Sequence, residues 1–537
     1  MVFLLSRSAR LNPSRKLAMQ TIPFLTLAAL SLIPLAALHA EEIKPAKPNI
    51  ILLLADDLRW DCLGFAGDQV IKTPNIDRLA SHGVVFRNSF ATSPVCAVSR
   101  AATLTGQYAR RNGVHDFTTH FPDLATTYPG VLRASGYYTG FIGKWGVDAA
   151  NVDYMRSCAR AFDFWAGDRD QTSYWHERTC NYVLNNGTSD RENYHCNCPA
   201  EVWKAQGTKG RGAHPLLKDP VHLETWVIPH KVGQFLDQRD PQKPFNLSIS
   251  FKAPHGPTNG YAPDFAKRFK DAMMPSRPNA TAAEAERQPE FLRQSLESDR
   301  GWKMAHDQGP GSLFQSTVRD YYRLVEGLDR SVGEIVAELE RRGLAGNTVI
   351  IFTSDNGHFH GEHGFYGKWL PHEESLRVPL VICDPRIPPA AVGRSCDAMV
   401  LNVDLGPTML DLAGAVVAPG MQGCSLRPLL TKPQADFRSA FFFEHLYEHG
   451  PKPPLHIEPS EGLRSAKWKY VHYIKQSGPQ SEELYQLASD PLEMANRISD
   501  PTAATALEKL RAEYNRLRTE LGPHQTWTRT PGRRDTE

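Results

Sequence analysis

The sequence carries almost no net charge and lacks a second long apolar run. Its 537 residues include 61 lysines and arginines against 59 aspartates and glutamates, a net charge of +2. Proteins that bind nucleic acid or a membrane surface usually carry a basic excess. The composition therefore predicts neither of these partners. Beyond residue 40 no segment is apolar enough to span a bilayer, and the chain has no internal repeat.

Residues 1–40 have the composition of an export signal. A basic region is followed by the uncharged segment "TIPFLTLAALSLIPLAALHA", which ends in the small residue Ala40. This order is typical of a secretory signal peptide. We expect cleavage near Ala40 and a periplasmic or secreted protein, or a lysosomal-type location in a eukaryote, with no membrane attachment after cleavage. The alternative is an uncleaved anchor, because the apolar run approaches spanning length.

The number of cysteines is odd. They are Cys62, Cys96, Cys158, Cys180, Cys196, Cys198, Cys383, Cys396 and Cys424. Export predicts an oxidising compartment in which disulfides persist. Cys96 stands alone among small residues, without the companions at short spacing that a metal-binding cysteine needs. If Cys96 is withheld for chemistry, we expect the other eight to pair.

Apolar runs alternate with amphipathic segments over residues 41–420. "PNIILLLADD" is a continuous apolar run ending in two acids, which is typical of a strand buried on both faces. "TPNIDRLASHG" follows as a short helix ended by Gly83. Further strands are expected within 135–145, 243–254, 347–357 and 375–385. The alternation predicts an α/β fold, with a large mixed, mostly parallel sheet flanked by helices.

Three other segments complete the expected organisation. Residues 320–344 predict a helix capped by Asp320, with an apolar stripe of Leu324, Leu328, Val332, Ile335, Val336 and Leu339. Residues 151–220 show weak periodicity and many Asn, Gly and Asp, which favours an elaborated surface insertion. Residues 421–537 predict a smaller α+β subdomain, with short antiparallel strands and a helix over 505–521.

Oxygen donors follow two of the expected strands. Asp56 and Asp57 end one apolar run, and Asp355 and Asn356 end another about 300 residues later. Functional groups in open α/β sheets collect where strands end at the carboxyl edge. Three carboxylates and an amide are ligands that Ca²⁺ or Mg²⁺ prefers. A turn or a helix cap is the alternative for either acidic pair alone.

Four cationic or titratable side chains occupy strand ends or glycine-bounded loops. They are Arg100, Lys144 in "GFIGKWG", His255 in "KAPHGP" and Lys368 in "HGFYGKWLP". Any one of them alone is more often a solvated surface group. Their shared placement favours an active site.

Together these motifs resemble the type I sulfatases, a family of the alkaline-phosphatase-like superfamily. "CAVSRAATLTG" is similar to the family signature C-x-P-S-R-x-x-x-L-T-G. "PNIILLLADD", "GKW", "APHGP", "TSDNG" and "GKWLPHEESLRVPL" follow the family's order. The resemblance extends from about residue 47 to the C-terminal strands.

The resemblance implies that a formylglycine-generating maturation enzyme oxidises Cys96 to an aldehyde, with Ser99 and Arg100 as part of its signal. One hydroxyl of the hydrated aldehyde attacks the sulfate sulfur and displaces the alcohol. The resulting sulfate hemiacetal then collapses, re-forming the C=O bond and expelling sulfate. Arg100 steadies the diol.

The resemblance also implies a cation and a sulfate site. We expect Ca²⁺ rather than Mg²⁺, held by Asp56, Asp57, Asp355, Asn356 and the diol derived from Cys96. Lys144, His255 and Lys368 would bind the sulfate. His255 or Lys368 would protonate the leaving oxygen.

Two positions depart from the family pattern. Val98 stands where the signature usually has proline, and the flanking Cys96, Ser99 and Arg100 still favour conversion. Gly146 replaces a histidine that contacts the diol in many members, which have "GKWHLG". We interpret this change as a subfamily feature.

Four further residues are candidates for the substrate rim: His360, His363, His445 and Arg464. His360 and His363 lie in "HFHGEHG", where three histidines also suggest zinc. No helical spacing supports zinc, so substrate contact is favoured.

The expected function is an exported sulfuric-ester hydrolase acting on a sulfated sugar or glycan, with N-acetylglucosamine-6-sulfatase-like specificity as the first hypothesis. One alternative is a phosphodiester or phosphonate monoester hydrolase of the same superfamily. The other is a non-catalytic glycan-binding homologue.

Overall fold

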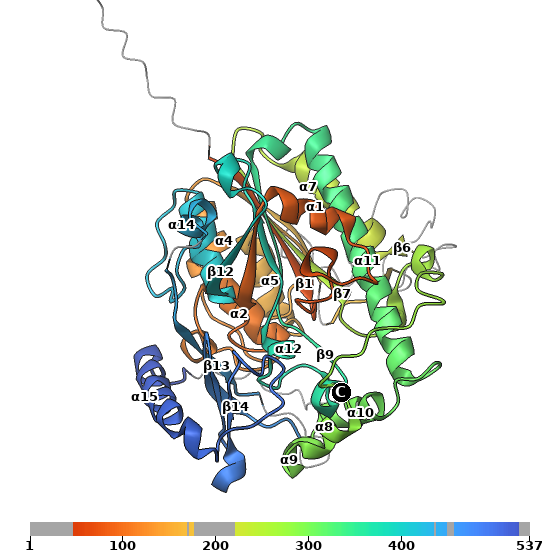
Figure 1. Cartoon of the computed structure of the whole chain (residues 1–537). Coiled ribbons are helices and arrows are strands. Elements are labelled where there is room, and N and C mark those ends of the chain that lie inside the picture. Colours follow the sequence, from red (N-terminus) through yellow and green to blue (C-terminus); the bar gives the residue numbers. More distant parts are fainter. Residues whose placement is uncertain (1–46, 169–170, 177–220, 434–435, 448–455, 526–537) are drawn as a thin grey trace, which may run out of the picture. The chain divides into compact units, whose positions relative to one another are not determined.

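A central eight-stranded sheet organises the computed structural model (Figure 1). Its strands, in spatial order, are β12 (Arg394–Leu401), β2 (Val84–Phe90), β11 (Leu380–Cys383), β8 (Thr348–Ser354), β1 (Asn49–Asp56), β7 (Phe245–Pro254), β3 (Tyr138–Lys144) and β4 (Phe164–Asp168). Seven of them are parallel, and β11 is antiparallel to both its neighbours. The predicted α/β fold with a mostly parallel sheet is confirmed.

The structure describes residues 47–168, 171–176, 221–433, 436–447 and 456–525, all within one unit. The predicted signal peptide and residues 177–220 of the predicted insertion lie outside these ranges, so both remain predictions. None of the helices in the described ranges combines the length and apolarity that a membrane span requires.

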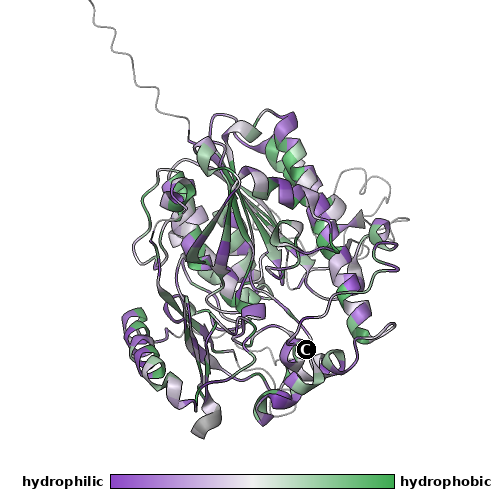
Figure 2. Ribbon diagram, viewed as in Figure 1, coloured by the Kyte–Doolittle hydropathy of each residue, from purple (hydrophilic) through white to green (hydrophobic). Residues whose placement is uncertain are grey.

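Both faces of the central strands are buried. In β1, Ile51 and Leu53 pack into one core, whereas Ile50 and Leu52 pack into the other. Successive side chains of a strand point to opposite faces, so a continuous apolar run suits a sheet covered on both sides. Figure 2 shows green, hydrophobic segments in the strands of the sheet, alternating with purple ones.

Helices cover each face. Those with side chains in the first core are α1 (Pro74–His82), α7 (Ile228–Gln238) and α11 (Leu313–Arg341). Those in the second are α2 (Cys96–Thr105), α4 (Tyr128–Ala134), α5 (Val152–Ala161), α13 (Leu405–Leu412) and α14 (Arg427–Thr431). The other helices that precede the C-terminal sheet are α3 (Ala109–Asn112), α8 (Ala282–Arg287), α9 (Glu290–Arg293), α10 (Leu296–His306) and α12 (Glu373–Leu376), and Met304 of α10 also lies in the first core.

The long helix α11 begins earlier than predicted. Its apolar stripe is confirmed, but the predicted cap Asp320 lies inside the helix and pairs with Arg323. The cap is Ser312, whose side chain accepts a hydrogen bond from the Gln315 N–H at 3.2 Å. Ser312 and Gln315 have the Ser-x-x-Gln spacing of a capping box. The polar turns that precede the stripe therefore belong to the helix.

Part of the predicted surface insertion belongs to the sheet. Residues 152–161 form α5, where Met155 and Cys158 are fully buried, and residues 164–168 form the edge strand β4. The prediction was wrong here because only a short apolar pattern marks each element. A small sheet of β5 (Trp175–His176) and β6 (Val221–His222) flanks the residues that are not described.

A second, antiparallel sheet follows in sequence. Its order is β13 (Ala440–His445), β14 (Ser460–Ser465), β15 (Lys469–Tyr473) and β16 (Glu482–Tyr485), and α15 (Ala504–Leu521) packs on it (Figure 1). This sheet confirms the predicted C-terminal architecture. Phe441 and Leu463 share a core with Phe90 and Leu401, which end strands of the large sheet.

The cysteines do not pair as expected. Cys62, Cys96, Cys158, Cys383, Cys396 and Cys424 are free, and the other three lie outside the described residues. Cys383 and Cys396 lie on β11 and β12, which flank β2 on opposite sides. Two strand spacings, about 9.5 Å, exceed the reach of a disulfide, about 7 Å between Cα atoms. Nearness in sequence was therefore a poor guide to pairing.

A buried ion-pair cluster ties the C-terminal sheet to α12. Lys469 Nζ lies 2.9 Å from Glu373 Oε1 and 2.6 Å from Glu493 Oε1, and the lysine side chain is fully buried. Burial alone raises the pKa of Glu373, but Lys469 and Arg464 outweigh it and lower that pKa. Burial raises the pKa of Glu493 to about 7. One lysine thus neutralises two acids from different segments.

We predict that Lys469→Met lowers the free energy of unfolding by about 3–5 kcal/mol, because two buried carboxylates lose their cation. The acids in the variant would have raised pKa values in the folded state, so the deficit grows as pH rises from 5 to 8. Denaturant titration at both pH values measures this. Lys303→Met, at an exposed pair with Asp299, is the control and should change stability little. Equal stability of the two variants would contradict the prediction.

Candidate active site

The acidic ends of β1 and β8 meet at the carboxyl edge of the large sheet. The two strands are parallel neighbours, with Ala55 opposite Ser354, so the next residues of both strands emerge side by side. The Asp57 N–H donates to Asp355 Oδ1 at 3.1 Å, and Asn356 Nδ2 donates to Asp57 Oδ1 at 2.7 Å. The predicted convergence of these two strand ends is confirmed.

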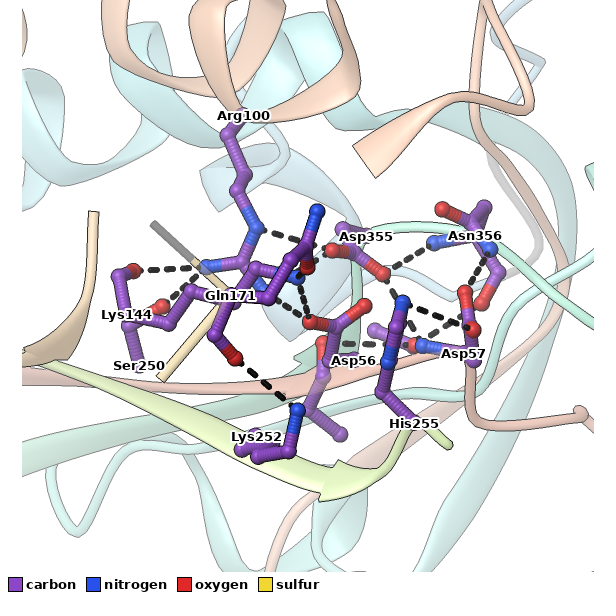
Figure 3. A network of polar contacts seen from close by, with 12 residues as sticks. Asp56, Asp57, Arg100, Lys144, Gln171, Ser250, Lys252, His255, Asp355 and Asn356 are labelled. Atoms are coloured by element: carbon purple, nitrogen blue, oxygen red, sulfur yellow. Dashed lines mark hydrogen bonds and ion pairs between the residues drawn. The ribbon is translucent and has the colours of Figure 1, made fainter. Parts of the chain in front are cut away.

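Helix α2 brings Cys96 and Arg100 to the same edge. Cys96 is its first residue, and Arg100 lies one turn further on. The Arg100 Nε and Nη2 atoms each lie 2.8 Å from Asp355 Oδ2, and its Nη1 donates to the Lys144 carbonyl at 2.9 Å (Figure 3). The Ser250 hydroxyl also accepts from Arg100. This arginine joins three strands beneath Cys96.

The remaining predicted cations line the carboxylates. Lys144 Nζ pairs with Asp56, and Lys368 Nζ lies 2.6 Å from Asp57 Oδ1. His255, which follows β7, places Nε2 3.7 Å from Asp57 Oδ2. Lys144 and Lys368 are almost fully buried, so their charges act at low dielectric and are strong.

The titration of the three aspartates reflects this balance. Burial alone raises the pKa of Asp56, but Lys144 and the neighbouring cations lower it well below its usual value. The pKa of Asp57 is also lowered, chiefly because Lys368 outweighs burial. Burial and the nearby Asp56 raise the pKa of Asp355 to about 7. Arg100 lowers the pKa of Asp355, but burial and the two other aspartates outweigh it.

Two oxygen atoms indicate where a cation fits. Asp56 Oδ1 and Asn356 Oδ1 are buried and have no hydrogen-bond partner among the described residues. Ligand atoms of Asp56, Asp57 and His255 lie within 4.8 Å of one another. Oxygen atoms that are buried and unsatisfied suit a hard divalent ion. Asp56, Asp57 and Asn356 therefore suit such an ion. The role of Asp355 as a ligand remains a prediction, because both of its carboxylate oxygens already accept hydrogen bonds.

Cys96 is poorly activated as a thiol. Its side chain is buried, and burial raises its pKa despite Lys144 and Lys368. A protonated thiol is a weak nucleophile at neutral pH. The attack of an unmodified cysteine is therefore disfavoured here.

His255 is neutral in this arrangement. Burial, Lys368 and Lys144 lower its pKa to about 3. Its Nδ1 lies 2.9 Å from the Gly256 carbonyl, which assigns the ring proton to Nδ1. By contrast, Asp57 and the other nearby acids raise the pKa of Lys368 despite its burial, and the ammonium keeps its proton.

The sequence reasoning missed two residues at this site. Gln171 Oε1 accepts from Lys144 Nζ at 2.8 Å, and its backbone carbonyl accepts from Lys252 Nζ at 2.9 Å (Figure 3). Burial and Lys144 lower the pKa of Lys252 to about 8. Lys252 precedes His255 by three residues, which was a usable signal. Gln171 lies in the weakly patterned segment and had none.

The predicted rim residues are dispersed. His360 packs edge-on against Tyr321, with ring centroids 4.4 Å apart. His363 is fully buried, and Asn279 Nδ2 lies 3.1 Å from its Nε2, in a polar cluster near the C-terminal sheet. Arg464 pairs with Glu373. His445 ends β13 and is 1% exposed, and burial lowers its pKa to about 3. Their roles in substrate contact remain predictions.

The arrangement does not favour zinc at "HFHGEHG". In the described part of the chain, candidate metal clusters are Asp56, Asp57 and His255, and separately Glu444, Glu461 and His524. Arg110 pairs with both glutamates of the second cluster, at 3.0 and 2.8 Å. Arg110 therefore already supplies positive charge to this second cluster.

The surroundings of Gly146 account for the absence of a histidine at this position. It has φ +83°, and a Cβ built there would lie 2.6 Å from Arg100 Cδ. The Arg100 side chain therefore occupies the space that a side chain at 146 needs. Val98, the other departure, packs in a small apolar cluster with Val95 and Ala109.

The loop carrying Asn356 is supported from α12. The Gly357 N–H donates to the Ser375 carbonyl at 2.8 Å, and a Cβ at Gly357 would lie 2.1 Å from the Glu374 carbonyl oxygen. Because Glu373 binds Lys469, the C-terminal sheet braces this support.

Two family models taken together, and several known proteins, match most of this chain. A family model described as sulfatase matches residues 48–415, and one described as the C-terminal part of N-sulphoglucosamine sulphohydrolase matches 361–520. An N-acetylglucosamine-6-O-sulfatase from Bacteroides thetaiotaomicron is 30% identical over 88% of this chain and 86% of the relative. An arylsulfatase from Clostridium perfringens is 26% identical over 87% and 93%.

A solved structure is similar over the same extent. It is a protein in complex with its substrate D-glucosamine-2-N,6-O-disulfate, with a TM-score of 0.70 and 26% identity. The match covers 88% of this chain and 98% of that chain.

We predict that Gly146→Ala destabilises the protein and reduces turnover of a sulfate ester at least tenfold, because the new Cβ displaces Arg100 from Asp355 and Lys144. Gly136→Ala is the matched control: Gly136 has φ +92° and no atom within 4 Å of a built Cβ. The control should lose only the backbone cost, roughly 1 kcal/mol. Thermal melting and steady-state kinetics measure both variants. Indistinguishable variants would refute the steric explanation.

Proposed function

We propose that this chain, which belongs to the sulfatase family, hydrolyses sulfate esters of sugars, with N-acetylglucosamine 6-sulfate as the first candidate substrate. The main support is the position of Cys96 at the start of α2, beside carboxylates that fit a cation. The side chains of Lys144, Lys368 and His255 lie at the same carboxylates. The relative that is 30% identical acts on an N-acetylglucosamine sulfate, and the similar solved structure holds a sulfated glucosamine.

The nucleophile in this proposal is formylglycine, made from Cys96 by a maturation enzyme. Its hydrated aldehyde supplies a hydroxyl for attack on sulfur, which the buried thiol does not offer at neutral pH. Cys96 forms no disulfide, as conversion requires. Ser99 donates to the Asp355 carbonyl, so in the folded protein it holds α2 against β8.

The cation in this proposal is Ca²⁺. Asp56, Asp57, Asp355 and Asn356 would hold it, together with the group derived from Cys96. Ca²⁺ accepts many oxygen ligands in flexible geometry, whereas Mg²⁺ demands a near-ideal octahedron and keeps several waters. When bound, it supplies positive charge that favours ionisation of the nucleophile and polarises a sulfate oxygen.

Lys144 and Lys368 would lie beside the sulfate oxygens and offset the charge that develops there. The neutral His255 would gain a proton when an anionic ester binds beside it, because nearby negative charge favours the protonated form. We therefore assign the leaving-group proton to His255 in the substrate complex. Lys368 holds its proton too tightly for this role.

We also propose export, directed by residues 1–40, to a periplasmic or extracellular location. Sulfated glycans outside the cell would then be the accessible substrates. The test of this proposal compares the location of the full-length protein with that of a variant lacking residues 2–40.

The test of the proposed function joins chemistry at Cys96 to turnover. We expect peptide mass spectrometry of the segment containing Cys96 to find formylglycine, and 4-nitrophenyl sulfate to be hydrolysed faster than 4-nitrophenyl phosphate. Cys96→Ala should abolish turnover. An unmodified thiol with no turnover would leave a glycan-binding homologue, and a preference for the phosphate by several orders of magnitude would favour the phosphoester alternative.

The proposed cation site has a separate test. Asp355→Ala should abolish turnover and remove the increase in melting temperature that CaCl₂ gives the wild-type protein, because the ion loses a ligand. Lys144→Ala should abolish turnover but keep most of the calcium-dependent stabilisation. Asp397→Ala, at an exposed pair with Arg87, is the control and should change neither property. Calcium-dependent stabilisation that persists in Asp355→Ala would remove Asp355 from the site.

A further inference from the structure

Three aromatic side chains meet beside the reacting end of the site. They are Phe117, Trp369 and Tyr447, which come from three distant parts of the chain. The Tyr447 ring lies 5.3 Å from Phe117 at an interplanar angle of 87°, and 6.4 Å from Trp369 at 62°. These are edge-to-face arrangements between rings in contact. We call these three residues the aromatic cluster.

The aromatic cluster adjoins the proposed nucleophile. Phe117 and Trp369 pack against a small buried group that includes Val95 and Val98, and these two valines flank Cys96 in sequence. Trp369 directly follows Lys368, whose ammonium group binds Asp57. One side of the cluster is therefore held against the start of α2, and another against the sulfate-binding cations.

The three rings are only half-buried, although they lie next to some of the most buried polar groups of the protein. Trp369 also has φ +82°, a left-handed conformation that is costly for a bulky residue. Lys368 before it is fixed by an ion pair, and Leu370 after it is fully buried. Such strain persists where surrounding structure holds a side chain in place for function.

The buried cations and the aromatic cluster together fit a ligand with two chemically different ends. The buried cations suit an anionic group, and partly exposed aromatic rings suit a flat apolar surface. The C–H face of a pyranose ring provides that surface, and a sulfate ester on the same ring provides the anion. A ringless sulfate ester would satisfy only the cationic end.

We propose that Phe117, Trp369 and Tyr447 form the binding surface for the sugar ring of the leaving group. The inference deepens the proposed function and rests on it for the choice of a sulfated sugar. The cluster places the ring next to the nucleophile, while Lys144, Lys368 and His255 bind the sulfate.

The test measures binding separately from turnover. The probe is N-acetylglucosamine 6-sulfate, observed by saturation-transfer NMR and titration with full-length protein carrying Cys96→Ala, so that the probe is not consumed. We expect saturation of the ring C–H protons. Tyr447→Ala and Phe117→Ala should each weaken sugar binding about tenfold, whereas Tyr447→Phe and Phe117→Tyr should retain it.

Two controls separate a contact from a structural effect. Inorganic sulfate should bind all variants equally, because it needs only the cations. Trp302→Ala removes a half-buried aromatic ring that stacks on His306 in α10, and it should leave sugar binding unchanged. Loss of sulfate binding together with sugar binding would assign the cluster a structural role and overturn the proposal. Unchanged sugar binding in both alanine variants, or none in the parent protein, would also overturn it.

The outcome is distinguishable from failure of the proposed function. If the protein with Cys96 intact hydrolyses 4-nitrophenyl sulfate but the alanine variants bind the sugar normally, the sugar-binding role of the aromatic cluster is refuted. The proposed sulfatase function is then retained. If no sulfate ester is hydrolysed but Tyr447→Ala abolishes sugar binding, the cluster stands as a sugar site without the proposed chemistry.

Discussion

The site depends on a charge balance at the ends of two neighbouring strands. Asp56 and Asp57 end one strand, and Asp355 ends the next, so three carboxylates crowd into a volume that excludes water. Such crowding is costly unless opposite charge is supplied. Lys144, Lys368 and Arg100 supply it, one cation for each carboxylate, and the same geometry leaves Asp56 Oδ1 and Asn356 Oδ1 buried without a hydrogen-bond partner among the described residues. The proposed cation site follows from these two oxygen atoms.

Arg100 is the structural centre of that balance. It binds Asp355, the Lys144 carbonyl and Ser250, and so fixes α2 relative to three strands. Its side chain fills the space in front of Gly146. A histidine at 146 is thus incompatible with this position of the arginine. The glycine at 146 and the position of the Arg100 side chain therefore depend on each other.

The large sheet does not position the site by itself. The Asn356 loop is supported by α12, α12 is held by Lys469, and Lys469 belongs to the C-terminal sheet. The same sheet carries Tyr447 just beyond β13 to the aromatic cluster beside Cys96. A C-terminal element that looks separate in sequence therefore reaches the site in two places. In the proposed sugar-binding surface, the small sheet would contribute to substrate binding as well as to stability.

The sequence alone determined the parts that depend on local pattern. The apolar run of β1, the stripe of α11 and the order of the motifs identified the fold class. The acids after β1 and β8 predicted that oxygen donors meet at one place, because parallel strands end at a common edge. Long-range contacts decided the rest. Asp320 was a plausible cap until Ser312 supplied a better one, and the cysteines near each other in sequence proved to be separated by β2. Gln171 and the aromatic cluster carry no local pattern, and only packing brings Gln171 to Lys144 and the aromatic cluster to the start of α2. Spacing along the chain records which elements form, whereas the distances between their side chains are set by how those elements pack.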